Sequence, residues 1–548
     1  MQTKILMISL DGATWDVLKS LVNRGEMPTL QKLMDEGCWG NLTSVIPPVT
    51  ACAWSSFMTG KNPDKHGILD FRHFDPRTKK DFITNASYIR GETLWQILSR
   101  HGKKVVVLNL PYTYPVYSVN GILVSGMDTP SKASDYCYPP ELKAELAQRF
   151  PEYAPVLPTW SMRDGATDWA LKKFIARLIS SAESRTQVAA HLLKEREWDI
   201  AMVHFQEIDY IQHVLFDRLQ KAARFEITDS ISDTMRGFFR HIDSSTARIL
   251  GSAHRDGVSL KVFVISDHGF GPYTGDAYPN VLLEEYGLLA RGNVEQLPYV
   301  SQSCIVRLKE RWASSRAWLV HTLHMVAKNA SLFLRGEKKR TCYDDLVVDD
   351  WAERKEVLWD QSSAAMVTGS HDALILASDE DSLQNCIRIL ENAEHPALGG
   401  RIFQQVLTFQ EAYGRDVSPG GALYCIAVPQ DGLAVQRGFS QESVTLFEQG
   451  PQGGIHRPQG IFVASGAGLV AGGQVDVNLI DMAPTVLTAL GLPNPNDMDG
   501  KPRTELFEEE IIVQVEEAKV SQQDGSKRGY SDDETALVEE RLRSLGYL

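Results

Sequence analysis

The sequence predicts an α/β fold, in which a central, mostly parallel β-sheet lies between layers of helices. Short runs of apolar and β-branched residues alternate along the chain with segments of helical character, which is typical of such folds. The runs are apolar at nearly every position, as expected for strands buried on both faces of a parallel sheet. Polar residues follow several of these runs directly. The runs lie at residues 4–10, 104–109, 199–204 and 260–266.

Length and composition fit a large globular protein. The chain has 548 residues, 43% of them hydrophobic, and its formal net charge of −14 disfavours general binding to nucleic acid polymers. Seven cysteines are scattered without disulfide-framework or zinc-binding spacing, which suits a reducing compartment. The first apolar run is too short for a signal peptide, and no stretch approaches the ~18 apolar residues of a membrane span. We therefore expect a cytoplasmic protein.

A candidate nucleophile lies in the segment 47–67, PPVTACAWSSFMTGKNPDKHG. Two prolines hold the incoming chain extended, and the sequence then predicts a short helix over residues 51–58 with Thr50 as its N-cap. The N-terminus of a helix favours anions, so a phosphoryl group attacked by Thr50 would be stabilised there. An ordinary capping role for Thr50 is the alternative.

Two long intervals interrupt the alternation of helix and strand. Residues 127–165 are rich in Pro and Tyr, which indicates an insertion or cap on the substrate side. Residues 290–355 form a second predicted insertion, in which 307–340 holds nine Lys/Arg and two Glu. We interpret 307–340 as a helix packed on the core; a lid over an anionic substrate and a contact with a membrane surface are alternatives. Other helices are expected from residue 15, at 30–36, 93–100, 169–195, 228–253, 381–391 and 481–490, and other strands at 373–377, 424–428 and 460–464.

The pattern of a compact domain ends near residue 505. Residues 1–505 are therefore predicted to form one α/β domain that includes both insertions. Residues 506–548 are polar and acidic up to an amphipathic stretch at 535–545, which we expect to dock on the domain as a short helix.

Side chains able to bind metal ions gather at predicted strand ends. Together with the Thr50 hydroxyl they suffice for two divalent cations with mixed nitrogen and oxygen ligands, which fits Zn²⁺ or Mn²⁺ better than Mg²⁺ or Ca²⁺. Two adjacent cations are an established device for phosphoryl transfer. On spacing alone, a set of buried, hydrogen-bonded polar residues is the alternative. The candidate ligands are Asp11, Asp209, His213, Asp267, His268 and a late His456 on a glycine-rich loop.

The order of these residues resembles the alkaline phosphatase superfamily. It is most similar to the type I phosphodiesterase/nucleotide pyrophosphatase branch and to a microbial group of predicted phosphohydrolases and phosphomutases. The resemblance covers nearly the whole chain and implies an alkaline-phosphatase-like fold. The matching features are Asp11, Thr50 within the segment 47–67, Asp209-x-x-x-His213, Ser266-Asp267-His268-Gly269 and Gly-x-His456.

The resemblance also implies a role for each matching residue. Thr50 would attack phosphorus and form a phosphothreonyl intermediate, which water would then hydrolyse. The implied metal ligands are Asp11, Thr50, Asp267 and His268 for one cation, and Asp209, His213 and His456 for the other.

The chain departs from the nucleotide pyrophosphatases at Phe71, where they carry an asparagine that holds a phosphate oxygen. Arg72 or Arg457 would supply the missing donor through charge-assisted hydrogen bonds; unrelated surface arginines are the alternative, which we favour slightly for Arg457. The sulfatase branch is disfavoured because its Cys/Ser-x-Pro-x-Arg motif is absent around Thr50. Cys52 lies two residues too late for it and is expected in the core.

We therefore expect a metal-dependent phosphohydrolase that cleaves a phosphodiester or phosphoanhydride in a small phosphorylated substrate. A phosphomonoesterase or a phosphomutase of the same superfamily is the near alternative. A non-catalytic phospholigand-binding module is the alternative from another class.

Overall fold

The computed structural model describes residues 2–157, 167–255, 257–293, 355–395, 399–415, 421–440, 442–446, 453–519, 529–545 and 547. Its contacts divide the chain into two units, Met1–Leu289 with Ser362–Leu548, and Ala290–Gln361. In the second unit, β12 (Arg291–Asn293) pairs with β13 (Lys355–Val357). The basic segment 307–340, predicted to form a helix packed on the core, lies outside the described residues. The following paragraphs concern the first unit.

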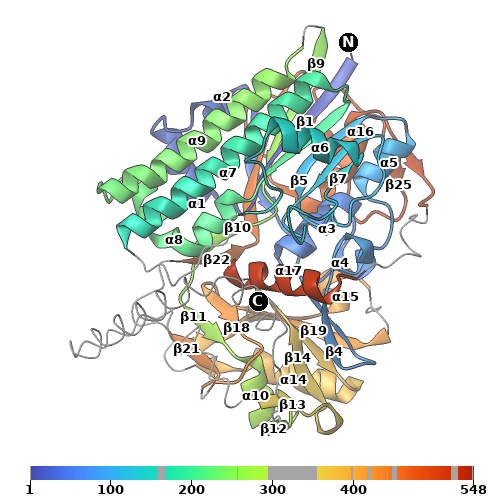
Figure 1. The fold of residues 1–548 in the computed structure, drawn as a ribbon. Helices are drawn as coiled ribbons and strands as arrows, with labels where there is room; N and C mark the ends of the chain where they lie inside the picture. Colours follow the sequence, from blue (N-terminus) through green and yellow to red (C-terminus); the bar gives the residue numbers. More distant parts are fainter. Residues whose placement is uncertain are drawn as a thin grey trace, which may run out of the picture. The chain divides into compact units, whose positions relative to one another are not determined.

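A nine-stranded sheet runs through the first unit in the order β24-β2-β23-β9-β1-β8-β5-β6-β7 (Figure 1). The strands from β9 to β6 are parallel, whereas β23 and β7 are antiparallel to their neighbours. The predicted mostly parallel sheet is confirmed. The bounds are β1 (Gln2–Leu10), β2 (Gly37–Thr43), β5 (Val105–Leu110), β6 (Gly121–Ser125), β7 (Cys137–Tyr138), β8 (Ile200–Phe205), β9 (Val258–Ile265), β23 (Gln459–Gly466) and β24 (Val477–Asn478).

The register of the central strands brings their carboxyl ends to one edge of the sheet. Leu10 at the end of β1 pairs with Phe205 at the end of β8, and Ser9 pairs with Ile265 at the end of β9. β5 and β8 are buried along their whole length, since helices cover both faces of the sheet here. Residues that follow β1, β8 and β9 are therefore neighbours in space.

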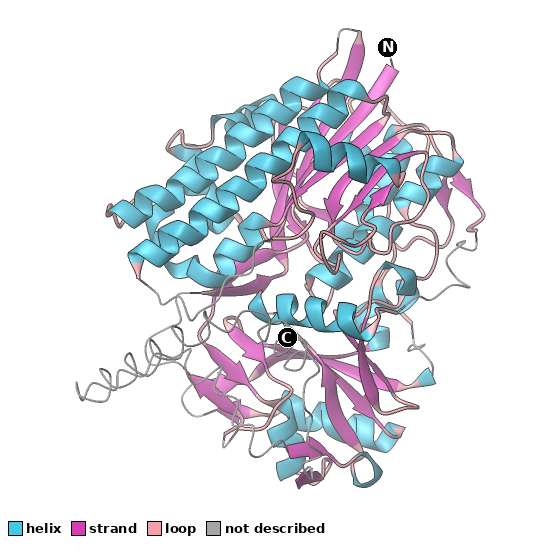
Figure 2. Cartoon of the chain, viewed as in Figure 1, coloured by secondary structure: helices cyan, strands magenta, loops and turns pink. Residues whose placement is uncertain are grey.

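Helices form a layer on each face of the sheet (Figure 2). On one face α7 and α9 pack along each other, with α1, α2 and α8 beside them; on the other, α3 packs against α5 and α16. The bounds are α1 (Trp15–Asn23), α2 (Pro28–Glu36), α3 (Thr50–Thr59), α4 (Pro63–His66), α5 (Leu94–Arg100), α6 (Glu141–Arg149), α7 (Asp168–Glu195), α8 (Glu207–Ala223), α9 (Ser230–Ala253) and α16 (Met482–Ala489).

A second, antiparallel sheet has the order β14-β15-β19-β18, with α14 packed against it. The predicted strands at 373–377 and 424–428 lie in this sheet and not in the main one. Its bounds are β14 (Ala364–Thr368), β15 (Ala373–Ala377), β18 (Phe403–Thr408), β19 (Leu423–Pro429) and α14 (Glu380–Glu391).

The interval 127–165 contains more regular structure than its composition indicates. β7 adds to the edge of the main sheet beside β6, and α6 follows it. Residues 158–166 are not described. The smaller elements of the unit are β3 (Arg72–Asp75), β4 (Lys80–Ile83), β10 (Gly269–Pro272), β11 (Gly275–Ala277), α10 (Pro279–Glu285), β16 (Glu394–His395), β17 (Gly400–Arg401), α15 (Phe409–Tyr413), β20 (Leu433–Val435), β21 (Val444–Leu446), β22 (Gly454–Arg457), β25 (Asn494–Pro495) and β26 (Val515–Glu516).

The helix predicted at 535–545 is present as α17 (Asp532–Ser544). Its buried Val538 and Leu542 join the main hydrophobic core, so the expected docking is confirmed. Among the helices of the described residues, none combines the length and apolar character needed to cross a membrane.

Candidate active site

Thr50 is the first residue of α3, a helix whose ten residues are all buried. The N-cap is Val49, so the prediction of Thr50 as the N-cap is wrong by one residue. A residue inside the first turn does not need its side chain for capping, and the hydroxyl is turned into a polar cluster. Its Oγ1 atom lies 3.2 Å from His268 Nε2 and 2.9 Å from the hydroxyl oxygen of Tyr547. The capping alternative therefore does not describe Thr50.

Asp11, Asp267 and His268 form the first half of this cluster, which we call the strand-end half. Asp11 follows β1 and the other two follow the adjacent parallel strand β9, so their meeting follows from the register. His268 Nε2 lies 3.3 Å from Asp267 Oδ2 and 3.8 Å from Asp11 Oδ1. Gly12 has a φ of +65°, and a Cβ there would lie 2.7 Å from the Phe270 ring. Glycine thus permits the turn in which the Gly12 N–H donates to Asp267 Oδ1 at 3.2 Å.

Asp209, His213 and His456 form the second half, which we call the helix half. Asp209 and His213 are one turn apart at the start of α8, so both face the same side of that helix. β22 pairs with β10 and places His456 opposite Phe270. The Nε2 atoms of His213 and His456 lie 3.4 and 3.3 Å from Asp209 Oδ1, and 3.0 Å from each other.

The two halves differ in their electrostatics. Burial raises the pKa of Asp11 and of Asp267 well above the usual range, and neighbouring carboxylates add to the effect. Burial also acts to raise the pKa of Asp209, but His213 and His456 outweigh it and hold the value below the usual range. Burial lowers the pKa of His268 well below its usual value and that of His456 to about 4. The two imidazoles are therefore neutral at pH 7.

The donor atoms fit divalent cations. Among the described residues, three buried carboxylate oxygens of the cluster accept no hydrogen bond: Asp11 Oδ1, Asp209 Oδ1 and Asp267 Oδ2. The ligand atoms of Asp209, His213 and His456 all lie within 4.8 Å of one another, as do those of Asp11, Asp209 and His268. Free carboxylate oxygens beside neutral imidazoles suit zinc-type N/O coordination, and buried unpaired oxygens are costly without such a partner.

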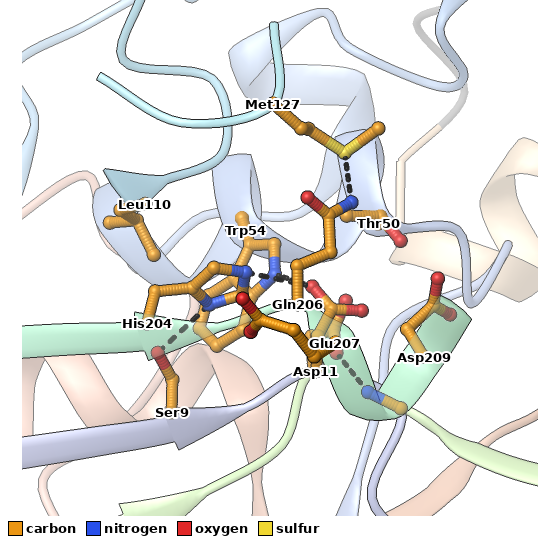
Figure 3. Close-up of polar contacts among 12 residues, drawn as sticks. Ser9, Asp11, Thr50, Trp54, Leu110, Met127, His204, Gln206, Glu207 and Asp209 are labelled. Atoms are coloured by element: carbon orange, nitrogen blue, oxygen red, sulfur yellow. Dashed lines mark hydrogen bonds and ion pairs between the residues drawn. The ribbon is translucent and has the colours of Figure 1, made fainter. Parts of the chain in front are cut away.

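Residues that the sequence analysis did not single out hold Asp11 in place (Figure 3). Trp54 Nε1 donates to Asp11 Oδ2 at 3.0 Å, and His204 Nε2 lies 3.2 Å from the same oxygen. Ser9, opposite His204 in the register of β1 and β8, contacts His204 Nδ1 at 3.0 Å. A histidine in an otherwise apolar strand was the available signal for His204.

The two arginines proposed as phosphate ligands are paired elsewhere. Arg457 pairs with Asp431 at 2.6 Å and Asp16 at 3.3 Å, and Arg72 lies 3.7 Å from Glu539. These carboxylates do not belong to the cluster.

Tyr547 occupies the place next to Phe71, with ring centroids 4.7 Å apart. Its hydroxyl lies 2.9 Å from Thr50 Oγ1 and donates to Asp209 Oδ2 at 2.8 Å. Burial and the carboxylates of Asp209 and Asp11 raise the pKa of Tyr547 well above its usual value, so the phenol stays protonated. Sequence periodicity gave no signal for this contact, which spans nearly the whole chain.

Comparison with solved structures finds one with this fold and reports a second, less similar one. A phosphonoacetate hydrolase from Sinorhizobium meliloti, in complex with phosphonoformate, has a TM-score of 0.54 and 15% identity over 89% of this chain and 95% of that chain. An inactive variant of murine ectonucleotide pyrophosphatase/phosphodiesterase 5, in complex with AMP, has a TM-score of 0.48 and 14% identity over 90% of this chain and 96% of that chain.

Sequence comparison connects the chain to the same group of enzymes. It is 30% identical to Homo sapiens ectonucleotide pyrophosphatase/phosphodiesterase family member 1 over 106 residues, which are 18% of this chain and 11% of that protein. The chain thus aligns with a small part of that relative. The family model for type I phosphodiesterase/nucleotide pyrophosphatase matches residues 5–367, a range that contains every residue of the cluster except His456 and Tyr547. The chain therefore belongs to the type I phosphodiesterase/nucleotide pyrophosphatase family, within the alkaline phosphatase superfamily.

Proposed function

We propose that the protein is a metal-dependent phosphohydrolase that uses Thr50 to cleave a phosphodiester or phosphoanhydride in a small substrate. The observation that carries the proposal is the position of the Thr50 hydroxyl. Thr50 is the first residue of a buried helix. Its hydroxyl lies 3.2 Å from His268 Nε2, among carboxylates and imidazoles that can bind a metal ion. A threonine hydroxyl is a weak nucleophile until a base or a metal activates it, and this cluster offers the ligands for that activation.

The charge of the cluster supports the need for cations. A phosphoryl anion beside Thr50 would meet Asp11, Asp209 and Asp267, and like charges a few ångströms apart in a buried site repel strongly. When bound, two divalent cations would offset this repulsion, lower the pKa of the Thr50 hydroxyl and stabilise charge on the phosphoryl oxygens. We assign Zn²⁺ or Mn²⁺ to two sites, one with Asp11, Thr50, Asp267 and His268, the other with Asp209, His213 and His456.

The residues of the chain then have these tasks. Thr50 Oγ1 forms a bond to phosphorus while the bond from phosphorus to the leaving oxygen breaks, which gives a phosphothreonyl intermediate. Water hydrolyses that intermediate and restores the hydroxyl. The unpaired N–H groups at the start of α3 favour the negative charge of the phosphoryl group.

Family membership supports this class of reaction, and the phosphonoformate bound to the structural neighbour supports a small phosphorylated substrate.

The test uses metal-stripped protein resupplied with Zn²⁺ or Mn²⁺, and chromogenic phosphate monoesters and diesters with the same leaving group. Thr50→Ala is expected to abolish metal-dependent turnover, and Thr50→Ser to retain part of it. Thr59→Ala is the matched control, because Thr59 is buried in the same helix and its hydroxyl donates to the Ser55 carbonyl at 2.8 Å, away from the cluster.

Each outcome separates the alternatives. A diester preference supports the proposal, whereas a monoester preference indicates a phosphomonoesterase. Turnover that survives in Thr50→Ala contradicts Thr50 as the nucleophile. Protein that holds two cations but hydrolyses neither ester would favour a phosphomutase, and protein that binds no cation would favour a phospholigand-binding module.

A further inference from the structure

Residues 531–545 and Tyr547 form a segment that packs on the α/β domain and contacts the cluster through Tyr547. We call it the docked segment. Its helix α17 begins with a capping box between Ser531 and Glu534. Arg541 of that helix is buried, and its guanidinium donates to the carbonyls of Met127 and Thr129 at 2.6 Å and of Pro130 at 2.7 Å. These three carbonyls satisfy the Arg541 guanidinium, and a buried guanidinium without hydrogen-bond partners would be costly. They therefore fix the position of α17.

Beyond α17, Tyr547 enters the cluster. Its side chain is 3% exposed, and its ring packs on Phe71 and faces His213 at a centroid distance of 5.3 Å. The Ser370 hydroxyl donates to the Tyr547 carbonyl oxygen at 3.0 Å. Backbone and side chain of Tyr547 are thus both held by residues of the site.

The position of the Tyr547 hydroxyl excludes a substrate. Reacting atoms must approach to about 3–3.5 Å before attack. The Tyr547 oxygen is already 2.9 Å from Thr50 Oγ1, and with Tyr547 in place Thr50 is 0% exposed. A phosphorus atom cannot reach Thr50 beside it.

One hydrogen-bond direction at Tyr547 is fixed. A carboxylate oxygen only accepts, so the single phenol proton points to Asp209 Oδ2. Thr50 Oγ1 has one proton and two neighbouring acceptors, the Tyr547 oxygen at 2.9 Å and His268 Nε2 at 3.2 Å, because His268 Nδ1 donates to the Gly269 carbonyl at 3.1 Å. The phenol proton is unavailable to a phosphoryl oxygen.

We propose that the docked segment is an intramolecular competitor of the substrate, and that Tyr547 must withdraw from Thr50 before a phosphoryl group can bind. This inference rests on the role of Thr50 in the proposed function. On withdrawal, the space between Phe71 and the imidazoles of His213 and His456 opens to the group attached to phosphorus.

The test measures the affinity of the full-length, Zn²⁺-loaded protein for inorganic phosphate by calorimetry, and in parallel kcat/KM for a chromogenic phosphodiester. Tyr547→Ala and Arg541→Met are expected to tighten phosphate binding by about tenfold, because the bonds they remove stabilise the closed state. The value of kcat/KM should rise by a similar factor. Tyr547→Phe keeps the ring and should have a smaller effect in the same direction.

Arg543→Met is the matched control on the same helix. The Arg543 side chain is 58% exposed and pairs with Glu539 of the same helix at 3.4 Å, so this variant should match the wild type. Thermal unfolding of every variant checks that the fold is retained.

The outcomes distinguish this inference from the proposed function. Tighter phosphate binding without turnover of the ester in any variant would support the competitor and contradict the hydrolase. Equal phosphate affinity in all variants would overturn the competitor, whatever the activity. A Tyr547→Phe variant with a lower kcat and unchanged phosphate affinity would make Tyr547 a catalytic donor, and the competitor proposal would be wrong.

Discussion

The strand-end half and the helix half of the cluster hold similar ligands in different ways. In the strand-end half, Asp11 and Asp267 are fully buried; this burial raises their pKa values, and neighbouring carboxylates add to the effect. In the helix half, His213 and His456 lie against Asp209 and hold its pKa low. A bound cation would therefore offset more charge in the strand-end half than in the helix half, where His213 and His456 already lie against the carboxylate.

This difference concerns electrostatics and not catalytic importance. If each half holds one cation, Asp267→Asn and Asp209→Asn should each lower kcat/KM by about 10³-fold, since both remove charge stabilisation from the transition state. Steady-state kinetics with a chromogenic diester at saturating metal measures this. A loss confined to one variant would mean that only one half takes part in the reaction.

Residues that contact the ligands without being ligands themselves should each affect metal binding in one half of the cluster. His204→Ala removes the imidazole next to Asp11, and His371→Ala removes the contact of 2.6 Å from His371 Nε2 to the His456 carbonyl oxygen. Each should weaken its own cation by about 10–100-fold, as such supporting groups generally do. Metal titration resolved into two binding steps measures both. Equal weakening of both steps by His204→Ala would show that the two halves are not separable.

The same substitutions should have opposite effects on the stability of the metal-free protein. Asp209→Asn removes a buried carboxylate that His213, His456 and the Tyr547 hydroxyl contact, and should destabilise the fold by about 1–3 kcal/mol. Asp267→Asn removes a carboxyl that burial disfavours in its charged form, so stability at pH 8 should stay equal or rise. Urea unfolding in the presence of a chelator measures the free energy of unfolding. Equal destabilisation by both variants would contradict the comparison.

The smallest expected effect is the pH dependence of stabilisation by metal. Because the folded pKa values of Asp11 and Asp267 are raised, the contribution of these two groups to the stability of the metal-free protein is fully present below the unfolded value of about 3.9 and is lost as pH rises through the folded values. A cation replaces those protons, so Zn²⁺ should raise the melting temperature more at pH 8 than at pH 5.5. Thermal unfolding with and without Zn²⁺ at the two pH values measures this. Equal shifts at both values would indicate that the strand-end carboxyls are already ionised without metal.

The strand-end half could be predicted from the sequence because each of its residues follows an apolar strand. Once β1 and β9 are adjacent and parallel, Asp11 and Asp267 have to meet, whatever the rest of the chain does. Asp209 and His213 were expected beyond a strand, and they lie on the first turns of α8, where their spacing of four residues gives them a common face. Local periodicity is enough for both results.

Other features depend on contacts that no local pattern encodes. The pairing of β22 with β10 brings His456 to Asp209. The hydrogen bonds of Arg541 to the carbonyls of residues 127, 129 and 130 hold α17 where Tyr547 contacts Thr50. Phe71 could be recognised as a departure from the family, but not as the surface on which Tyr547 packs.

By itself, the sequence determined the α/β fold and the carboxyl ends of the strands as the place of the site, because strands and helices follow from the spacing of apolar residues along short segments. The residues of the cluster were expected from their order along the chain, which resembles that of the superfamily. Only the tertiary structure decided that Thr50 begins its helix and does not cap it, that Arg72 and Arg457 are paired elsewhere, and that Tyr547 covers the nucleophile. These outcomes are set by packing and hydrogen bonding between residues far apart in the chain, which segment-by-segment patterns do not contain.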